Sequence, residues 1–147
     1  MIKKLLYKYL GLHPNSISFY ETFNLTGLPI VTFEQGDQKL NFILDTGSDH
    51  NVIDSNILEN IEHIQINEKF KLSGLDNVKH EVSCHDITLH YKDIEFTSMF
   101  LAKDLKDVSA EVKRQRGVEV HGFLGSLFFN KYKYILDFKH LIAYSKA

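Results

Sequence analysis

Residues 44–49 read Leu-Asp-Thr-Gly-Ser-Asp and end an apolar stretch of the chain. An apolar stretch of this kind is typical of a buried strand, which here delivers Asp45 to a tight turn. Thr46 and Ser48 supply hydroxyl groups at the turn, and Gly47 lets the backbone pass close to the carboxylate. The motif occurs once in the chain. The fold must therefore hold a single acidic turn at the end of a buried strand.

Length and charge limit the class of protein. The 147 residues fit one domain with enough chain to bury a core, and 44% hydrophobic with 24% charged residues is ordinary for a soluble globular protein. Seventeen basic residues against nineteen acidic ones give a net charge of -2, so charge provides no reason to expect a nucleic-acid partner. No stretch approaches the roughly 18 apolar residues that span a bilayer, so no membrane partner is expected.

The cysteine content and the N-terminus bear on the cellular compartment. Cys84 is the only cysteine, which excludes an intrachain disulfide and favours a reducing compartment. Lys3 and Lys4 ahead of apolar residues imitate a secretory signal, but Lys8 interrupts the apolar stretch and no small-residue cleavage site follows. We therefore expect a cytoplasmic protein, with a secreted one as the less favoured alternative.

The chain divides into an extension and one domain. Residues 1–26 form the N-terminal extension, in which residues 3–10 have spacing compatible with a helix or a frayed terminal helix. Residues 17–26 are expected to be irregular or extended. Residues 27–147 form the domain, which contains no repeats and no low-complexity linker.

Strand patterns dominate the domain, so the expected fold class is mainly all-β. Strands are expected at residues 29–33, 40–44, 51–53, 69–72, 78–82, 87–91, 94–97, 99–102, 134–138 and 141–144. A short C-terminal helix is predicted at 127–131, with Ser126 as its cap, and further short helices at 55–61 and 105–115.

A second motif, Phe123-Leu124-Gly125, precedes the predicted C-terminal helix. Together and in this order, the two motifs resemble those of the retropepsin-like aspartic proteases, the single-domain relatives of pepsin. In that family an apolar-apolar-Gly strand crosses beneath the Asp-Thr-Gly turn and holds it. The resemblance covers residues 28–144 and implies a retropepsin-like closed β-barrel half-domain.

The resemblance implies that Asp45 is the catalytic acid of an aspartic-type endopeptidase that needs no cofactor. In this chemistry a water held between two carboxyl groups is deprotonated by one of them, while the other, protonated, polarises the scissile carbonyl. Two close carboxyl groups share a proton and titrate as a unit. By the same resemblance Thr46 bonds across to the opposite half, the Gly47 N–H holds the carboxylate, and Ser48 bonds its outer oxygen.

The sequence contains no second Asp-Thr-Gly. Asp137 lies between apolar residues, but Thr-Gly does not follow it. The same turn is missing after Asp54, Asp76, Asp86, Asp93, Asp104 and Asp107. The resemblance therefore implies a symmetric homodimer that takes one Asp45 from each chain and hydrolyses a peptide or protein substrate. His121 and Asp49 are local variations beside the motifs and are expected to tune the site.

Two alternatives to this active homodimer stay open. One is a non-catalytic peptide-binding or dimerisation module of the same fold, which recognises an extended peptide without cutting it. The other is a chain that needs a different partner chain to complete the site.

The family also covers its substrate with a hairpin flap, for which residues 70–82 are the best candidate. Its tip includes Ser73, Gly74 and Leu75, and its backbone would bond an extended peptide as an added strand. The tip departs from the Gly-rich retroviral form because it has one glycine and a charged Asp76.

Simpler interpretations apply to the other reactive side chains. His80, Cys84, His85 and His90 invite a metal-site interpretation, but adjacent residues of a strand point to opposite faces and the spacings match no zinc pattern. No metal is therefore expected, and a cysteine buried in a strand is more common than a nucleophile. For Asp45 the simpler alternative is a structural aspartate that caps a tight turn.

Overall fold

The computed structural model describes residues 2, 13, 15–73 and 79–145, and side chains outside 67–81. The predicted helix at 3–10 and the flap-tip residues Gly74 and Leu75 lie outside the described residues. None of the described helices is long and apolar enough to cross a membrane.

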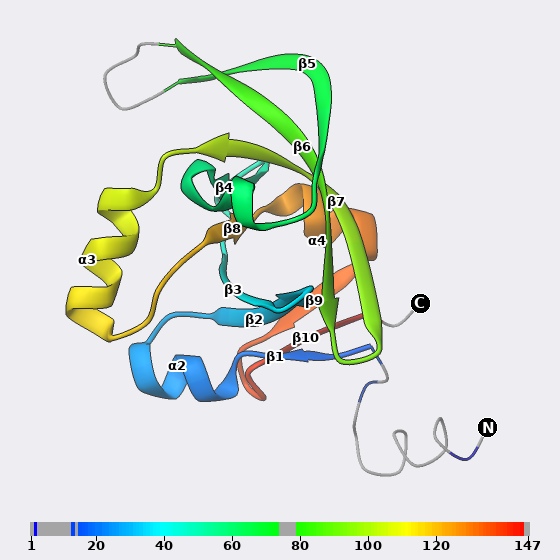
Figure 1. Cartoon of the computed structure of the whole chain (residues 1–147). Helices are drawn as coiled ribbons and strands as arrows, with labels where there is room; N and C mark the ends of the chain where they lie inside the picture. Colours follow the sequence, from blue (N-terminus) through cyan, green and yellow to red (C-terminus); the bar gives the residue numbers. More distant parts are fainter. Residues whose placement is uncertain (1, 3–12, 14, 74–78, 146–147) are drawn as a thin grey trace.

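Within the described residues, six strands close into a mixed β-barrel (Figure 1). In spatial order these are β2 (Ile30–Gln35), β3 (Gln38–Leu44), β8 (Gly122–Leu124), β4 (Asn51–Asp54), β7 (Ile94–Lys103) and β6 (Lys79–Tyr91). Pairing of Glu34 with His90 joins β2 to β6 and closes the barrel, while β5 (Ile64–Ser73) continues the sheet beyond β6. The pairs β3–β8 and β4–β7 are parallel, and the others are antiparallel.

A smaller sheet and short helices complete the described chain. In the smaller sheet β10 (Ile142–Ser145) lies between β1 (Ile17–Ser18) and β9 (Tyr134–Asp137). The helices are α2 (Tyr20–Thr26), the 3-10 helix η1 (Ser55–Asn60), α3 (Lys106–Arg116) and α4 (Ser126–Tyr132). In Figure 1, α3 and α4 lie on opposite sides of the barrel.

Most of the predicted elements are confirmed. The hairpin of β2 and β3, the hairpin of β9 and β10, and helix α3 lie where the sequence patterns predict them. Residues 79–82 of one predicted strand and the predicted strand at 87–91 are parts of one continuous strand, β6, and the predicted strands at 94–97 and 99–102 are both parts of β7. The apparent breaks were too polar in sequence to be recognised as strand, but a long ladder between β6 and β7 pairs them.

The prediction for residues 17–26 was wrong over most of the segment. Ile17–Ser18 form the extended strand β1, but Tyr20–Thr26 form helix α2 instead of an irregular or extended lead-in. Ile17 and Phe19 are buried in the core, and the ring of Phe19 lies 5.4 Å from that of Phe138. The segment adopts this structure because the C-terminal hairpin covers its few apolar side chains. Local sequence does not reveal that contact.

The predicted cap of the C-terminal helix was also wrong. The N-cap residue of α4 is Gly125, and Ser126 is the first residue of the helix. The Ser126 hydroxyl donates to the Ser48 carbonyl at 3.2 Å. The hydroxyl is therefore used in a contact between α4 and the Asp45 turn.

Aromatic side chains fill the barrel. The ring of Phe33 packs edge-on against Phe42 at 5.9 Å and against Phe96 at 5.7 Å, and Phe96 lies 5.3 Å from Phe128. All four rings are at most 2% exposed. Burial of each such side chain contributes about 1.5–3 kcal/mol, so this cluster supplies much of the force that holds the strands around it.

Gly122 allows β8 to fit between its neighbours. A Cβ atom at this position would lie 2.2 Å from the Val52 carbonyl oxygen on β4 and 2.6 Å from the Phe42 ring on β3. Both contacts are closer than van der Waals packing permits, and one of them is to backbone. Only glycine allows the three strands to approach in this way.

We predict that Gly122→Ala lowers the free energy of unfolding by about 3 kcal/mol, because the added methyl forces β3, β8 and β4 apart. Gly117→Ala is the control, since Gly117 has φ of 78° and nothing near its missing Cβ. Backbone strain alone should cost that variant about 1 kcal/mol. Urea unfolding measures both, and an equal loss in the two variants would contradict the packing argument.

Candidate active site

The Asp45 turn is held by main-chain hydrogen bonds. Asp45 follows β3, and its N–H donates to the Leu124 carbonyl on β8 at 2.8 Å. The Gly47 N–H donates to Asp45 Oδ1 at 3.0 Å, and the Ser48 N–H donates to the Asp45 carbonyl at 3.2 Å. Asp45 is half-buried, while Thr46 and Gly47 are exposed. The turn thus fixes the carboxylate and leaves it accessible.

Strand β8 runs between the two strands that flank the turn. Leu44 of β3 pairs with Leu124 in parallel, and Val52 of β4 pairs with Phe123 in the antiparallel sense. The structure therefore brings Phe123, Leu124 and Gly125 to the base of the Asp45 turn, from a position about 80 residues away in the chain.

Gly125 is where α4 contacts the loop after Asp45. A Cβ at Gly125 would lie 2.4 Å from the His50 carbonyl oxygen and 2.6 Å from that of Ser48. The Ser126 N–H donates to the Ser48 carbonyl at 2.8 Å, and the Leu127 N–H donates to the Asp49 carbonyl at 3.2 Å. The first turn of α4 thus supplies donors to the carbonyl groups of the loop.

The expected role of Ser48 needs correction. Its hydroxyl donates to the His50 carbonyl at 2.8 Å, inside the same loop. A hydroxyl has one hydrogen, so this bond leaves it no donor for the outer oxygen of Asp45. Ser48 stabilises the loop that follows the turn, and the carboxylate receives its described hydrogen bond from Gly47.

Asn51 is a structural member of the site that sequence analysis missed. It is fully buried at the start of β4, and its Oδ1 accepts the Gly125 N–H at 3.0 Å. Its Nδ2 donates to Ser98 Oγ at 2.9 Å and to the Met99 carbonyl at 3.0 Å. One amide therefore joins β4, β7 and the end of β8. An Asn six residues after Asp45 has no recognisable signal by itself, because its partners come from distant strands.

Asp137, considered above as a possible second acid, stabilises a turn. Its Oδ1 accepts the N–H groups of Lys139 at 3.0 Å and His140 at 3.1 Å. The His140 ring lies 2.7 Å from its Oδ2 and, as the largest cause, lowers the pKa of this carboxyl. These hydrogen bonds give Asp137 a structural role in the turn that joins β9 to β10.

The predicted hairpin is confirmed as a hairpin. β5 and β6 pair with Phe70 opposite Val82 and Ser73 opposite Lys79, and their described ends reach out beyond the barrel in Figure 1. The register shifts between Ile66 and Phe70, which is typical of a bulge that bends a strand. Whether the hairpin serves as a flap stays a prediction.

Two histidines, His63 and His85, meet at the base of this hairpin. Among the described residues, no three His, Cys, Asp or Glu side chains are grouped so as to hold a metal ion. His85 is buried, and its Nδ1 lies 2.9 Å from His63 Nδ1 while its Nε2 lies 2.8 Å from Ser83 Oγ. Burial, and next the neighbouring His63, lower the pKa of His85. Cys84 is buried in the same strand.

No protein-family model matches the chain, and a search of curated proteins finds no match either. The two motifs and their geometry are therefore the basis for a functional assignment.

We predict that Asn51→Ala lowers the free energy of unfolding by about 3 kcal/mol, because it leaves the buried Gly125 N–H without an acceptor and opens a cavity. Asn51→Asp keeps the acceptor but loses both amide donors, so it should also destabilise the protein. Asn130→Ala, an exposed Asn→Ala change in α4, should stay within about 0.5 kcal/mol of wild type. Urea unfolding tests this, and a neutral Asn51→Ala would contradict the structural role of Asn51.

Proposed function

We propose that the chain is a retropepsin-like aspartic endopeptidase that acts as a homodimer and uses Asp45 from each subunit. The observation that carries the proposal is the bond between the Asp45 N–H and the Leu124 carbonyl. It ties an Asp-Thr-Gly turn to an apolar-apolar-Gly segment, which is the combination that the family resemblance requires. A purely structural aspartate would not need a distant glycine strand beneath its turn.

The proposed reaction is hydrolysis of a peptide bond without a covalent intermediate. One Asp45 carboxylate takes a proton from a water molecule, whose oxygen bonds to the scissile carbonyl carbon. The second Asp45, protonated, donates to the carbonyl oxygen. The C–N bond of the resulting tetrahedral species then breaks, and the leaving amine takes up a proton.

The need for a second copy follows from the composition of the half-site. The chain has one Asp-Thr-Gly turn, and a two-fold axis beside it would bring two such turns together. Thr46 is exposed beside Asp45, where its hydroxyl can bond to the opposite turn. Leu127, whose side chain is exposed on the adjoining helix α4, offers an apolar contact for the same interface.

The proposed substrate is an extended segment of a peptide or protein. Such a segment would pair with the β5–β6 hairpin as an added strand, with pockets that read alternate side chains. The proposed location is the cytoplasm, on the argument from a single cysteine given above.

We predict that Asp45→Asn reduces peptide cleavage by about a hundredfold to ten-thousandfold or more, because it removes the general base and acid. The amide oxygen still accepts the Gly47 N–H, so unfolding should change little. The control is Asp93→Asn, an exposed aspartate in the β6–β7 turn, which should cleave like wild type. A peptide library assayed across acidic to neutral pH measures the activity. Peptide binding that persists in Asp45→Asn, with no cleavage by wild type, would favour the non-catalytic module.

The homodimer gives a second, independent prediction. When wild type and Asp45→Asn are mixed in equal amounts and exchange subunits, cleavage should fall to roughly a quarter of the wild-type value at the same total concentration. Independent monomers would keep about half, because each intact chain would remain active. Sedimentation of each protein alone should show dimers. A strict monomer without cleavage would overturn the proposal.

A further inference from the structure

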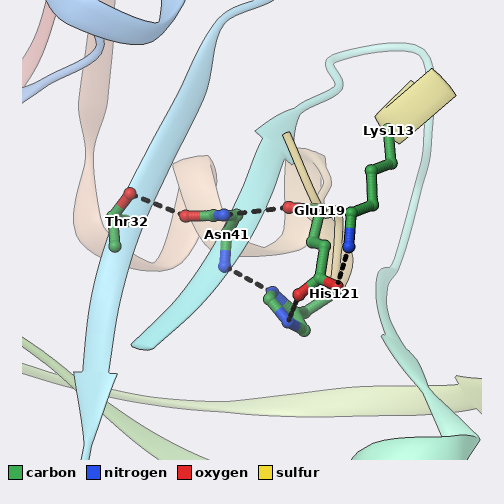
Figure 2. Close-up of polar contacts among 5 residues, drawn as sticks. All are labelled: Thr32, Asn41, Lys113, Glu119 and His121. Carbon is green, nitrogen blue, oxygen red and sulfur yellow. Dashed lines mark hydrogen bonds and ion pairs between the residues drawn. The ribbon is translucent and has the colours of Figure 1, made fainter. Parts of the chain in front are cut away.

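His121, just before the start of β8, is bonded to the middle of β3, and both strands support the Asp45 turn (Figure 2). Its Nδ1 accepts the main-chain N–H of Asn41 on β3 at 2.9 Å, and its own N–H donates to the Asn41 carbonyl at 2.8 Å. Its carbonyl accepts the N–H of Asp54 on β4 at 2.8 Å. The residue thus binds β3 through both its backbone and its ring, four residues before Asp45, and leads directly into β8.

The bond at Nδ1 specifies the protonation state of the ring. An N–H donor facing Nδ1 requires a lone pair there, so the neutral ring carries its proton on Nε2. Protonation would place a second N–H against that of Asn41. The hydrogen bond would then be replaced by the contact of two donors.

Asn41 cannot easily adapt to that change, because its side chain is held from both sides. Its Oδ1 accepts the Thr32 hydroxyl on β2 at 2.7 Å, and its Nδ2 donates to the Glu119 carbonyl at 2.9 Å. Figure 2 shows these bonds converging on Asn41 from the neighbouring strand and from the segment before His121.

Two carboxylates, Glu119 and Asp54, act on His121, and a lysine pairs with one of them. Glu119 Oε2 lies 3.9 Å from its Nε2, Asp54 is on the adjacent strand β4, and Lys113 of α3 pairs with Glu119 Oε1 at 3.0 Å. Both carboxylates favour the protonated, positively charged form of the His121 ring. Burial disfavours that form and has the larger effect, so the pKa of His121 is lowered from its ordinary range.

We propose that His121 is a proton-operated latch on the candidate active site. The neutral ring holds the middle of β3, at Asn41, to the start of β8, and protonation opens this pairing and loosens the turn that both strands support. The latch is a property of the fold, while its consequence for cleavage rests on the proposed function. It regulates the site by setting the lowest pH at which the Asp45 turn and the Phe123–Gly125 segment stay together.

The sign of the pH effect follows from linkage. Because the folded state has the lower pKa, the unfolded chain binds more protons as the pH falls through about 6.5. The latch therefore contributes its full stability above that pH. This contribution declines as the pH falls from there toward the folded pKa.

The test is urea unfolding of the full chain from about pH 8 to pH 5, the range in which histidine titrates. His121→Asn is the informative variant, because its Oδ1 accepts the same N–H and does not titrate. The difference between the midpoints of wild type and His121→Asn should be constant above about pH 7.5 and shift in favour of the variant below about 6.5. His85 titrates in both proteins, so its effect cancels.

His90→Asn is the matched control, since its side chain is 48% exposed and pairs with Glu95 on the surface. It should keep the wild-type dependence on pH. A His121→Asn profile parallel to that of wild type would overturn the latch, as would imidazole NMR that finds the proton on Nδ1 at neutral pH.

Cleavage assays separate the latch from the proposed function. If the chain is a peptidase, the acid limit of cleavage should move to lower pH in His121→Asn. A shift in stability without cleavage by any variant supports the latch and rejects the peptidase. Cleavage with an unchanged acid limit and parallel unfolding profiles rejects the latch and leaves the peptidase standing.

Discussion

The insertion of β8 between β3 and β4 is the interaction on which the rest of the structure depends. All three residues of β8 pair with β3 in parallel, and Gly122 and Phe123 also pair with β4 in the antiparallel sense. This places the Leu124 carbonyl under the Asp45 N–H. Gly122 and Gly125 make the approach possible, because a Cβ at either position would collide with backbone oxygen atoms. A turn at the end of β3 is thereby supported by a segment from near the opposite end of the chain.

Buried polar groups then fix β8 in the position between β3 and β4 that the two glycines permit. Asn51 joins the end of β8 to β4 and β7, and His121 joins its beginning to β3. Each is largely buried, so an unpaired donor or acceptor there would cost free energy that water could not recover. Aromatic packing holds the barrel together and already penalises a one-residue slip, which would turn buried rings to the other face of a strand. The amide and imidazole bonds add to this selection, because each needs its partner at one place in the neighbouring strand, and they lie beside the half-site on which the proposed function depends.

Local patterns predicted the elements whose signal is local. The hairpin of β2 and β3, the C-terminal hairpin and helix α3 follow from apolar alternation, turn residues and a terminal Gly117. Predictions failed where a distant partner decides the outcome. Residues 17–26 become ordered against the C-terminal hairpin, and the hydroxyl groups of Ser48 and Ser126 bind carbonyl groups of the Asp45 loop instead of the carboxylate or a helix cap.

The sequence by itself determined that the chain is mainly β, that it has one Asp-Thr-Gly turn after a buried strand, and that an apolar-apolar-Gly segment follows far along the chain. These are properties of residue type and order, and a one-dimensional pattern contains them. Only the tertiary structure decided that the two motifs meet, that Asn51 and His121 hold them together, and that Asp137 stabilises a turn. The physical reason is that hydrogen-bond partners and close glycine contacts are set by strand order, which local sequence does not encode.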